Sequence, residues 1–214
     1  MPLARPALIC AALLLAGCMR PGPSLDAELG ELMQALPGSY AGMVPKALAA
    51  DGEMERLVHS FVPIEVPQFG PKVLYYQIAS GTADGKVLQA KIFVFSADKG
   101  RKANTMRAYI LDPAQAGETL YADPARLAAL NPSALMSFPQ ACFFRWSRVG
   151  GGFAGEGSPT CAYPSRAFGQ MIRPEMSYRI LGNRFEWGEV LRGEDGGAIV
   201  STNGTLTALR QKAM

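Results

Sequence analysis

Residues 72–96 read KVLYYQIASGTADGKVLQAKIFVFS. The runs 72–80 and 87–96 are rich in β-branched and aromatic residues, and Ala83-Asp84-Gly85 lies between them as a turn signal. A second turn, at residues 97–100, leads into a third β-type run at 105–111. Because the runs are short and the turns tight, this stretch predicts an antiparallel meander.

The rest of the chain repeats this pattern. Further β-type runs are separated by glycine-rich turns and cover residues 141–149, 152–155, 165–172, 176–181, 184–192 and 199–209. Leucine spacing predicts an amphipathic helix from Leu25 to Leu36, with Ser24 as its N-cap. Asp123-Pro124 predicts the start of a short helix inserted between strands. The expected fold is therefore mainly β, as a barrel or a sandwich.

The N-terminus predicts secretion and lipidation. Arg5 precedes an apolar stretch that ends at Leu15-Ala16-Gly17-Cys18, which is typical of a cleaved signal. The ending resembles the bacterial lipoprotein signal, in which the cysteine is acylated. We expect residues 1–17 to be the signal peptide, 18–24 the lipidated cysteine with its tether, and 25–214 a single domain. The alternative is an ordinary signal that leaves Cys18 unmodified.

Lipidation would place the domain in the cell envelope, bound to the membrane through acyl chains such as palmitate. If the cell is Gram-negative, Met19 in place of Asp after the cysteine favours the periplasmic face of the outer membrane. The formal net charge is only +3, and no basic stripe is present, so the sequence shows no electrostatic footprint for nucleic acid.

Cysteine and histidine usage limits the chemistry. Only Cys142 and Cys161 remain beyond the signal and Cys18, which in an oxidising compartment predicts one disulfide worth roughly 3 kcal/mol. A reactive thiol pair is the alternative.

His59 is the only histidine, so a zinc site of several histidines is excluded, and a Ser-His-Asp triad would have to use His59. No metal site or catalytic residue is predicted, and His59 is interpreted as a half-exposed residue before a strand.

Strand alternation suggests a binding site. If the barrel encloses a cavity, apolar walls with a few polar groups would suit a small amphipathic ligand. The polar side chains expected to point inward are Tyr75, Gln77, Lys91, Arg107, Tyr109 and Glu186. The alternative is that they point into solvent around a packed interior, with Glu186 paired to Arg184. Trp146 and Trp187 are expected in the core, and Arg166 could reach an anionic ligand or lie at a solvated edge.

Several motifs resemble the CpcT/CpeT family, the T-type phycobilin chromophore lyases of cyanobacteria. The motifs follow one another in the family's order over most of residues 25–192. They are Leu36-Pro37-Gly38-Ser39-Tyr40, Leu74-Tyr75-Tyr76-Gln77, the Asp123 helix with Leu135, Phe138 to Trp146, Gly151 to Gly155, Cys161 and Phe185-Glu186-Trp187-Gly188. The resemblance implies a calyx-like antiparallel β-barrel that holds a bilin such as phycocyanobilin, often as a homodimer. The implied activity is thioether formation between the bilin and a phycobiliprotein cysteine.

The chain departs from that family at two places. The family's acidic residue on the first long strand is Tyr76 here, and its Arg-x-Arg on the next strand aligns with Gln89 and Lys91. Three hypotheses follow: a lipid-anchored, lyase-like calyx that binds an amphipathic, bilin-like ligand; a true phycobilin lyase; and an envelope interaction module with a filled barrel. A cavity with inward basic groups would favour either of the first two, and a closed apolar interior the third.

Overall fold

The computed structural model describes residues 23–45, 53–112, 120–202 and 204–211. The predicted signal peptide and Cys18 lie outside these residues. The helical elements are α1 (Leu25–Ala35), the short 3₁₀ helix η1 (Leu120–Ala122) and α3 (Pro124–Ala128). The strands are β1 (Gly38–Pro45), β2 (Met54–Pro63), β3 (Val73–Ser80), β4 (Val87–Asp98), β5 (Ala103–Leu111), β6 (Met136–Ser137), β7 (Phe144–Val149), β8 (Gly152–Gly157), β9 (Tyr163–Ser165), β10 (Gln170–Leu181), β11 (Arg184–Arg192), β12 (Ala198–Ser201) and β13 (Leu206–Arg210).

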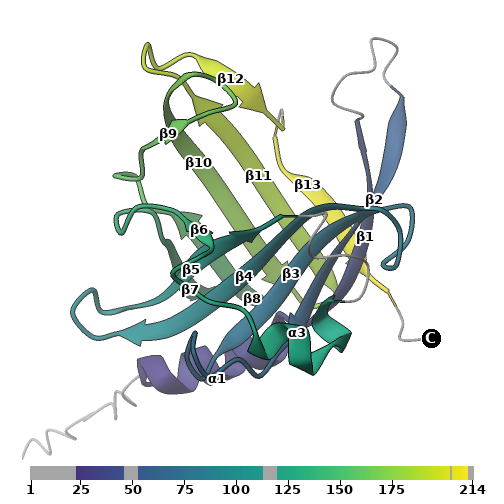
Figure 1. Cartoon of the computed structure of the whole chain (residues 1–214), viewed down its shortest axis with the longest axis vertical. Coiled ribbons are helices and arrows are strands. Elements are labelled where there is room, and N and C mark those ends of the chain that lie inside the picture. Colours follow the sequence, from purple (N-terminus) through teal and green to yellow (C-terminus); the bar gives the residue numbers. More distant parts are fainter. Residues whose placement is uncertain (1–22, 46–52, 113–119, 203, 212–214) are drawn as a thin grey trace, which may run out of the picture.

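Ten of these strands close into an antiparallel barrel (Figure 1). The order around the ring is β11-β13-β1-β2-β3-β4-β5-β7-β8-β10, and β10 pairs back onto β11. Closure leaves no free edge within the ring. The short strands β6, β9 and β12 extend the sheet from β5, β10 and β11. The mainly β, calyx-like barrel expected from the sequence is confirmed.

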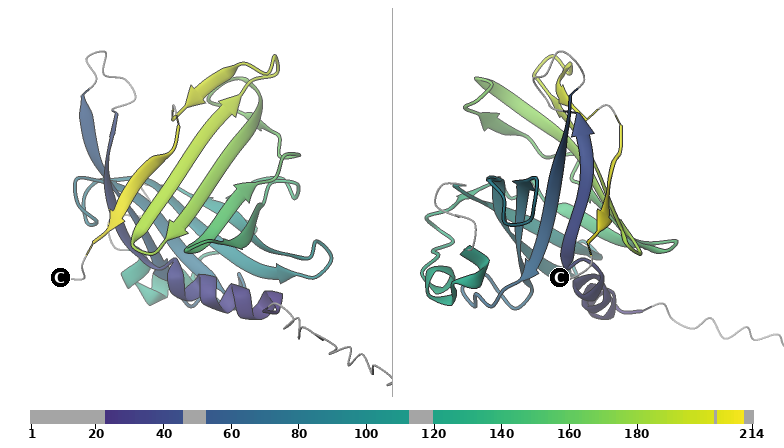
Figure 2. Two further views of the ribbon diagram at one scale, coloured as in Figure 1. Left: turned by 180° about the vertical axis from the view of Figure 1, so that it is seen from behind. Right: turned by 90° about the vertical axis from the view of Figure 1, so that its right-hand side faces the viewer.

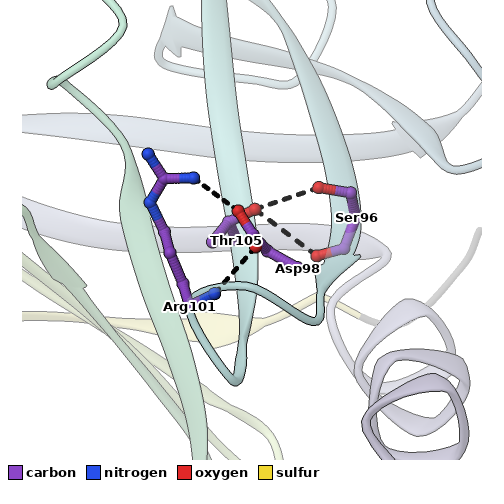
Figure 3. Close-up of polar contacts among 4 residues, drawn as sticks. All are labelled: Ser96, Asp98, Arg101 and Thr105. Atoms are coloured by element: carbon purple, nitrogen blue, oxygen red, sulfur yellow. Dashed lines mark hydrogen bonds and ion pairs between the residues drawn. The ribbon is translucent and has the colours of Figure 1, made fainter.

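The meander that predicted this fold forms as β3, β4 and β5. Figure 3 shows the β4–β5 hairpin, where the Asp98 carboxylate accepts a 2.9 Å hydrogen bond from the Arg101 backbone N–H and pairs with its guanidinium. The Ser96 and Thr105 hydroxyls lie 3.0 Å apart on facing strands. These contacts fix the turn and the register, and the register directs alternate residues of β4 into the barrel.

The barrel interior is filled at one end by an aromatic core. Phe185 and Phe61 lie at its centre, and Trp146 and Trp187 belong to it, as predicted. The helix α1 lies under this end of the barrel (Figure 2). Leu29 and other leucines of α1 belong to the core. Ser24 caps α1 by accepting a 3.2 Å hydrogen bond from the Ala27 N–H, also as predicted. One end of the barrel is therefore closed.

A second apolar cluster lies on the outside of the barrel. Val73, Tyr75 and Ile92 on the outer face of β3 and β4 pack with Leu120 and Leu127, from η1 and α3. Gln68 reinforces this cover, because its side-chain amide donates to the carbonyls of Leu127 and Leu130. As a result, β3 and the central part of β4, residues 90–93, are buried on both faces.

Some sequence expectations for this region are corrected. His59 is not half-exposed before a strand; it lies within β2 with 0% of its surface exposed, because odd-numbered residues of β2 face the barrel core. The expected run 199–209 is divided between β12 and β13, and 165–172 between β9 and β10. Among the described helices, none has the length and apolar character needed to cross a bilayer.

Candidate functional site

A cavity of about 1020 Å³ occupies the part of the barrel that the aromatic core does not fill. Inward residues of β4, β5, β10 and β11 form one part of its wall, and the segments around β6 and β9 form another. Phe93, Phe144 and Tyr178 belong both to the cavity lining and to the core packing, so they form its floor. A mostly apolar space of this order is large enough for a drug-sized ligand.

The predicted disulfide is confirmed and lies in the cavity wall. Cys142 and Cys161 are bonded, and both line the cavity. They join the segment before β7 to the segment after β8. Nearby, the rings of Phe138 and Tyr163 lie 4.9 Å apart and bring the same two segments together a second time. The disulfide therefore helps to hold the cavity wall in shape.

Three charged side chains line the cavity: Lys91, Glu189 and Arg166. Lys91 is on β4 with 8% of its surface exposed, and Arg166 is an exposed residue between β9 and β10. Burial lowers the pKa of Lys91, and the Glu189 carboxylate opposes this by raising it. In the described part of the chain, the Lys91 ammonium has no hydrogen bond or ion pair of its own. A cation that lines a largely apolar cavity is stabilised when an anionic ligand group binds beside it.

Two tyrosines of the cavity wall interact electrostatically with the same carboxylate. Burial raises the pKa of Tyr178 and of Tyr163, and the negative charge of Glu189 raises both further. These phenols therefore remain protonated at neutral pH and can donate hydrogen bonds. The site thus combines one buried amine, one carboxylate and two phenolic donors in an apolar surrounding.

The structure separates the six polar residues that were expected to point inward. Lys91 alone of the six lines the cavity. Tyr75 and Gln77 are buried on the outer face of β3, where the Tyr75 hydroxyl donates to Gln77 Oε1 at 3.1 Å and Gln77 Nε2 donates to the Ala83 carbonyl. Their expected inward orientation is corrected, because the outer apolar cluster covers this face.

The other three residues also face outward. Tyr109 packs edge-on against Phe69, with ring centroids 5.1 Å apart, in the outer cluster. Arg107 is exposed on β5. Glu186 forms an ion pair with Arg184 at 3.1 Å, which was the alternative interpretation of this residue. Their inward placement is therefore corrected as well.

Glu189 is the main site residue that the sequence interpretation missed. It lies two and four positions after Trp187 and Phe185, so alternation along β11 places all three on the inner face. Had the two aromatic residues been used to fix the inner face, Glu189 would have been selected in place of Glu186. Tyr163 had no such signal, since β9 is only three residues long.

The site has no metal-ligand character. Among the described residues, no three side chains of His, Cys, Asp or Glu gather as a metal site would require. The residues present suit a ligand held by apolar contact, one cation and several hydrogen bonds.

Comparison with known proteins supports the fold. No family model matches the chain, and no curated protein does. The structure is similar to that of the CRL protein of Arabidopsis, with a TM-score of 0.60 and 14% identity over 88% of this chain and 100% of that one. It is also similar to the T-type phycobiliprotein lyase CpeT from Prochlorococcus phage P-HM1, with a TM-score of 0.47 and 9% identity over 86% and 98%. The first match shows a shared fold alone, and the second is too loose to assign anything to this chain.

Proposed function

We propose that the protein binds a small amphipathic, bilin-like ligand with an anionic end in the open part of its barrel. The observation that carries this proposal is the largely buried side chain of Lys91, which lines an apolar cavity of about 1020 Å³ and whose ammonium has no hydrogen bond or ion pair among the described residues. An anionic ligand group would compensate that charge, while the apolar walls would exclude water from the rest of the ligand. The cavity and its inward cation favour a binding protein over an interaction module with a filled barrel.

A bilin titration tests this proposal. We expect phycocyanobilin or biliverdin to give saturable induced circular dichroism in the visible region when added to the full chain. Lys91→Ala should weaken binding about tenfold or more, because a hydrogen bond to a charged group contributes about 1.5–3 kcal/mol. The matched control is Arg107→Ala, which removes a cation from the outer face and should leave affinity unchanged.

Two results would contradict this function. One is the absence of induced dichroism at tens of micromolar protein. A Kd in that range corresponds to a binding free energy on the order of −6 kcal/mol. The other is equal weakening by the Lys91 and Arg107 variants, which would place the ligand outside the cavity.

A lyase that transfers a bilin to a protein cysteine is the second candidate. It is favoured by one observation: Lys91, which aligns with one arginine of the family's basic pair, lines the cavity as a cation, whereas Gln89 replaces the other arginine. In that case the cavity would hold the bilin, and a client protein would supply the thiol. Covalent transfer of bound bilin to an added apo-phycobiliprotein would distinguish this candidate from simple binding.

We also propose that a lipid on Cys18 anchors the protein in the cell envelope. Support comes from the Leu15-Ala16-Gly17-Cys18 ending and from the short segment between Cys18 and the start of α1 at Leu25. When the full chain is expressed in a bacterium fed an alkyne analogue of palmitate, we expect it to be labelled. Cys18→Ser should abolish the label and Cys10→Ser should retain it. Equal labelling of the two variants would refute the anchor.

A further inference from the structure

Lys91 is placed to act as a nucleophile as well as a charge. Its cross-strand neighbours are Tyr76 on β3 and Ile110 on β5, and Phe93 follows it on the same face of β4. These surroundings disfavour the charged ammonium, and burial lowers its pKa. A lysine amine that is neutral more often than those on the surface is the form that attacks carbonyl carbons.

Glu189 lies on the opposite wall of the same cavity. β4 and β11, which carry the two residues, are five strands apart in either direction around the ten-strand ring. The Glu189 carboxylate also raises the pKa of Lys91 through its negative charge. The other titratable groups that line this space are Tyr163, Tyr178 and, at the exposed side, Arg166, and Tyr76 lies beside Lys91 on the neighbouring strand. Burial raises the pKa of each of these tyrosines, so Glu189 supplies the negative charge at neutral pH.

We propose that the cavity holds an apolar aldehyde or ketone covalently, as an imine on Lys91 with Glu189 as its counter-ion. The Nζ lone pair attacks the carbonyl carbon and gives a carbinolamine. Loss of water then forms the C=N bond, and a proton on this nitrogen gives an iminium cation opposite the carboxylate. The step needs no oxidant, reductant or co-reactant. This inference rests on the ligand cavity of the proposed function, and it names a second class of occupant, an apolar carbonyl compound, beside the ligand with an anionic end.

Borohydride trapping with all-trans-retinal tests the proposal. The full chain would be incubated with retinal at neutral pH and then reduced, which converts the imine into a stable secondary amine. We expect the protein mass to rise by that of retinal less one oxygen atom. A modified Lys91 resists trypsin, so the label should appear on peptide 87–99. Lys91→Arg keeps the charge but should reduce labelling at least tenfold, and Lys86→Arg, an exposed control, should leave it unchanged.

Glu189→Gln gives an independent readout. The imine should still form, but its absorbance should lie at shorter wavelength than in the wild type, because the iminium loses its counter-ion and gives up its proton more readily. Label spread over the exposed lysines, or unaffected by Lys91→Arg, would overturn the proposal. Should Lys91→Arg fail to fold by circular dichroism, the wild-type peptide map alone decides.

Retinol separates failure of this proposal from failure of the proposed function, because it has the same carbon skeleton without the carbonyl. Retinol that binds, together with retinal that is not trapped, would overturn the imine and leave the ligand cavity in place. If neither compound associates with the chain, the imine proposal fails, and the bilin titration decides the proposed function separately.

Discussion

Phe185→Ala is expected to lower the free energy of unfolding by about 3–5 kcal/mol, the usual loss when a buried phenylalanine becomes alanine. Phe185 has 0% of its surface exposed at the closed end of the barrel. Its ring lies 5.1 Å from that of Phe61, 5.5 Å from Trp187 and 5.8 Å from Tyr40. These partners come from different strands, so they cannot move into the space left by the Phe185 side chain without distorting the barrel.

Urea unfolding at neutral pH, followed by far-ultraviolet circular dichroism, would measure the effect. Phe168→Ala is the matched control, because Phe168 is 39% exposed and should cost much less. A loss below about 1 kcal/mol for Phe185→Ala would show that the barrel core can relax into the cavity.

Acidification from about pH 7 to about pH 5 should destabilise the protein by about 2 kcal/mol through His59 alone. Burial lowers the pKa of His59 from 6.5 to about 3 in the folded state. The reason is local: Nδ1 lies 2.8 Å from the Tyr76 hydroxyl, Nε2 has no partner among the described residues, and the ring packs against Trp187. A protonated ring would therefore be a buried cation with little compensation.

The direction of this pH dependence follows from the lowered pKa of His59 in the folded state. The neutral ring favours folding, and this contribution is present in full above pH 6.5, where the unfolded ring is neutral as well. Below pH 6.5 His59 is protonated in the unfolded chain but stays neutral in the folded chain. The free energy of unfolding therefore falls by about 1.4 kcal/mol per pH unit until the pH approaches 3.

His59→Gln isolates this effect, because the chain has one histidine. The variant keeps a polar side chain that does not titrate, so its stability should be flatter between about pH 7 and about pH 5. Carboxylates whose pKa the structure shifts, such as those of Asp98 and Glu175, are shifted downward and titrate below this range. Equal slopes for wild type and variant would refute a neutral buried His59.

Local signals in the sequence predicted the elements well. The β-type runs around 72–96 formed β3 and β4 because their composition and turns act over a few residues. Ser24 and Asp123 cap α1 and α3 for the same reason, since a capping side chain bonds to a backbone N–H three residues later. Cys142 and Cys161 could be paired because the predicted signal peptide and lipidation account for Cys10 and Cys18.

The site was predicted less well, because its residues are defined by faces and by distant strands. Alternation divides Tyr75 from Tyr76 but cannot say which of them faces inward when both faces of β3 are apolar. On β4 the inner face was identified correctly at Lys91. On β11 Glu186 was chosen in place of Glu189, because the sequence interpretation did not establish which residues of this strand face inward.

The sequence by itself determined a mainly β chain, its helix caps, its turns and one disulfide, because each depends on neighbouring residues or on cysteine count. The tertiary structure alone decided which face of each strand lines the cavity, since the segment around η1 and α3 covers the outside of β3 and β4. It also placed Lys91 and Glu189, almost a hundred positions apart in the chain, on opposite walls of one space. That juxtaposition arises from closure of the ring, which joins strands far apart in sequence and which no local pattern encodes.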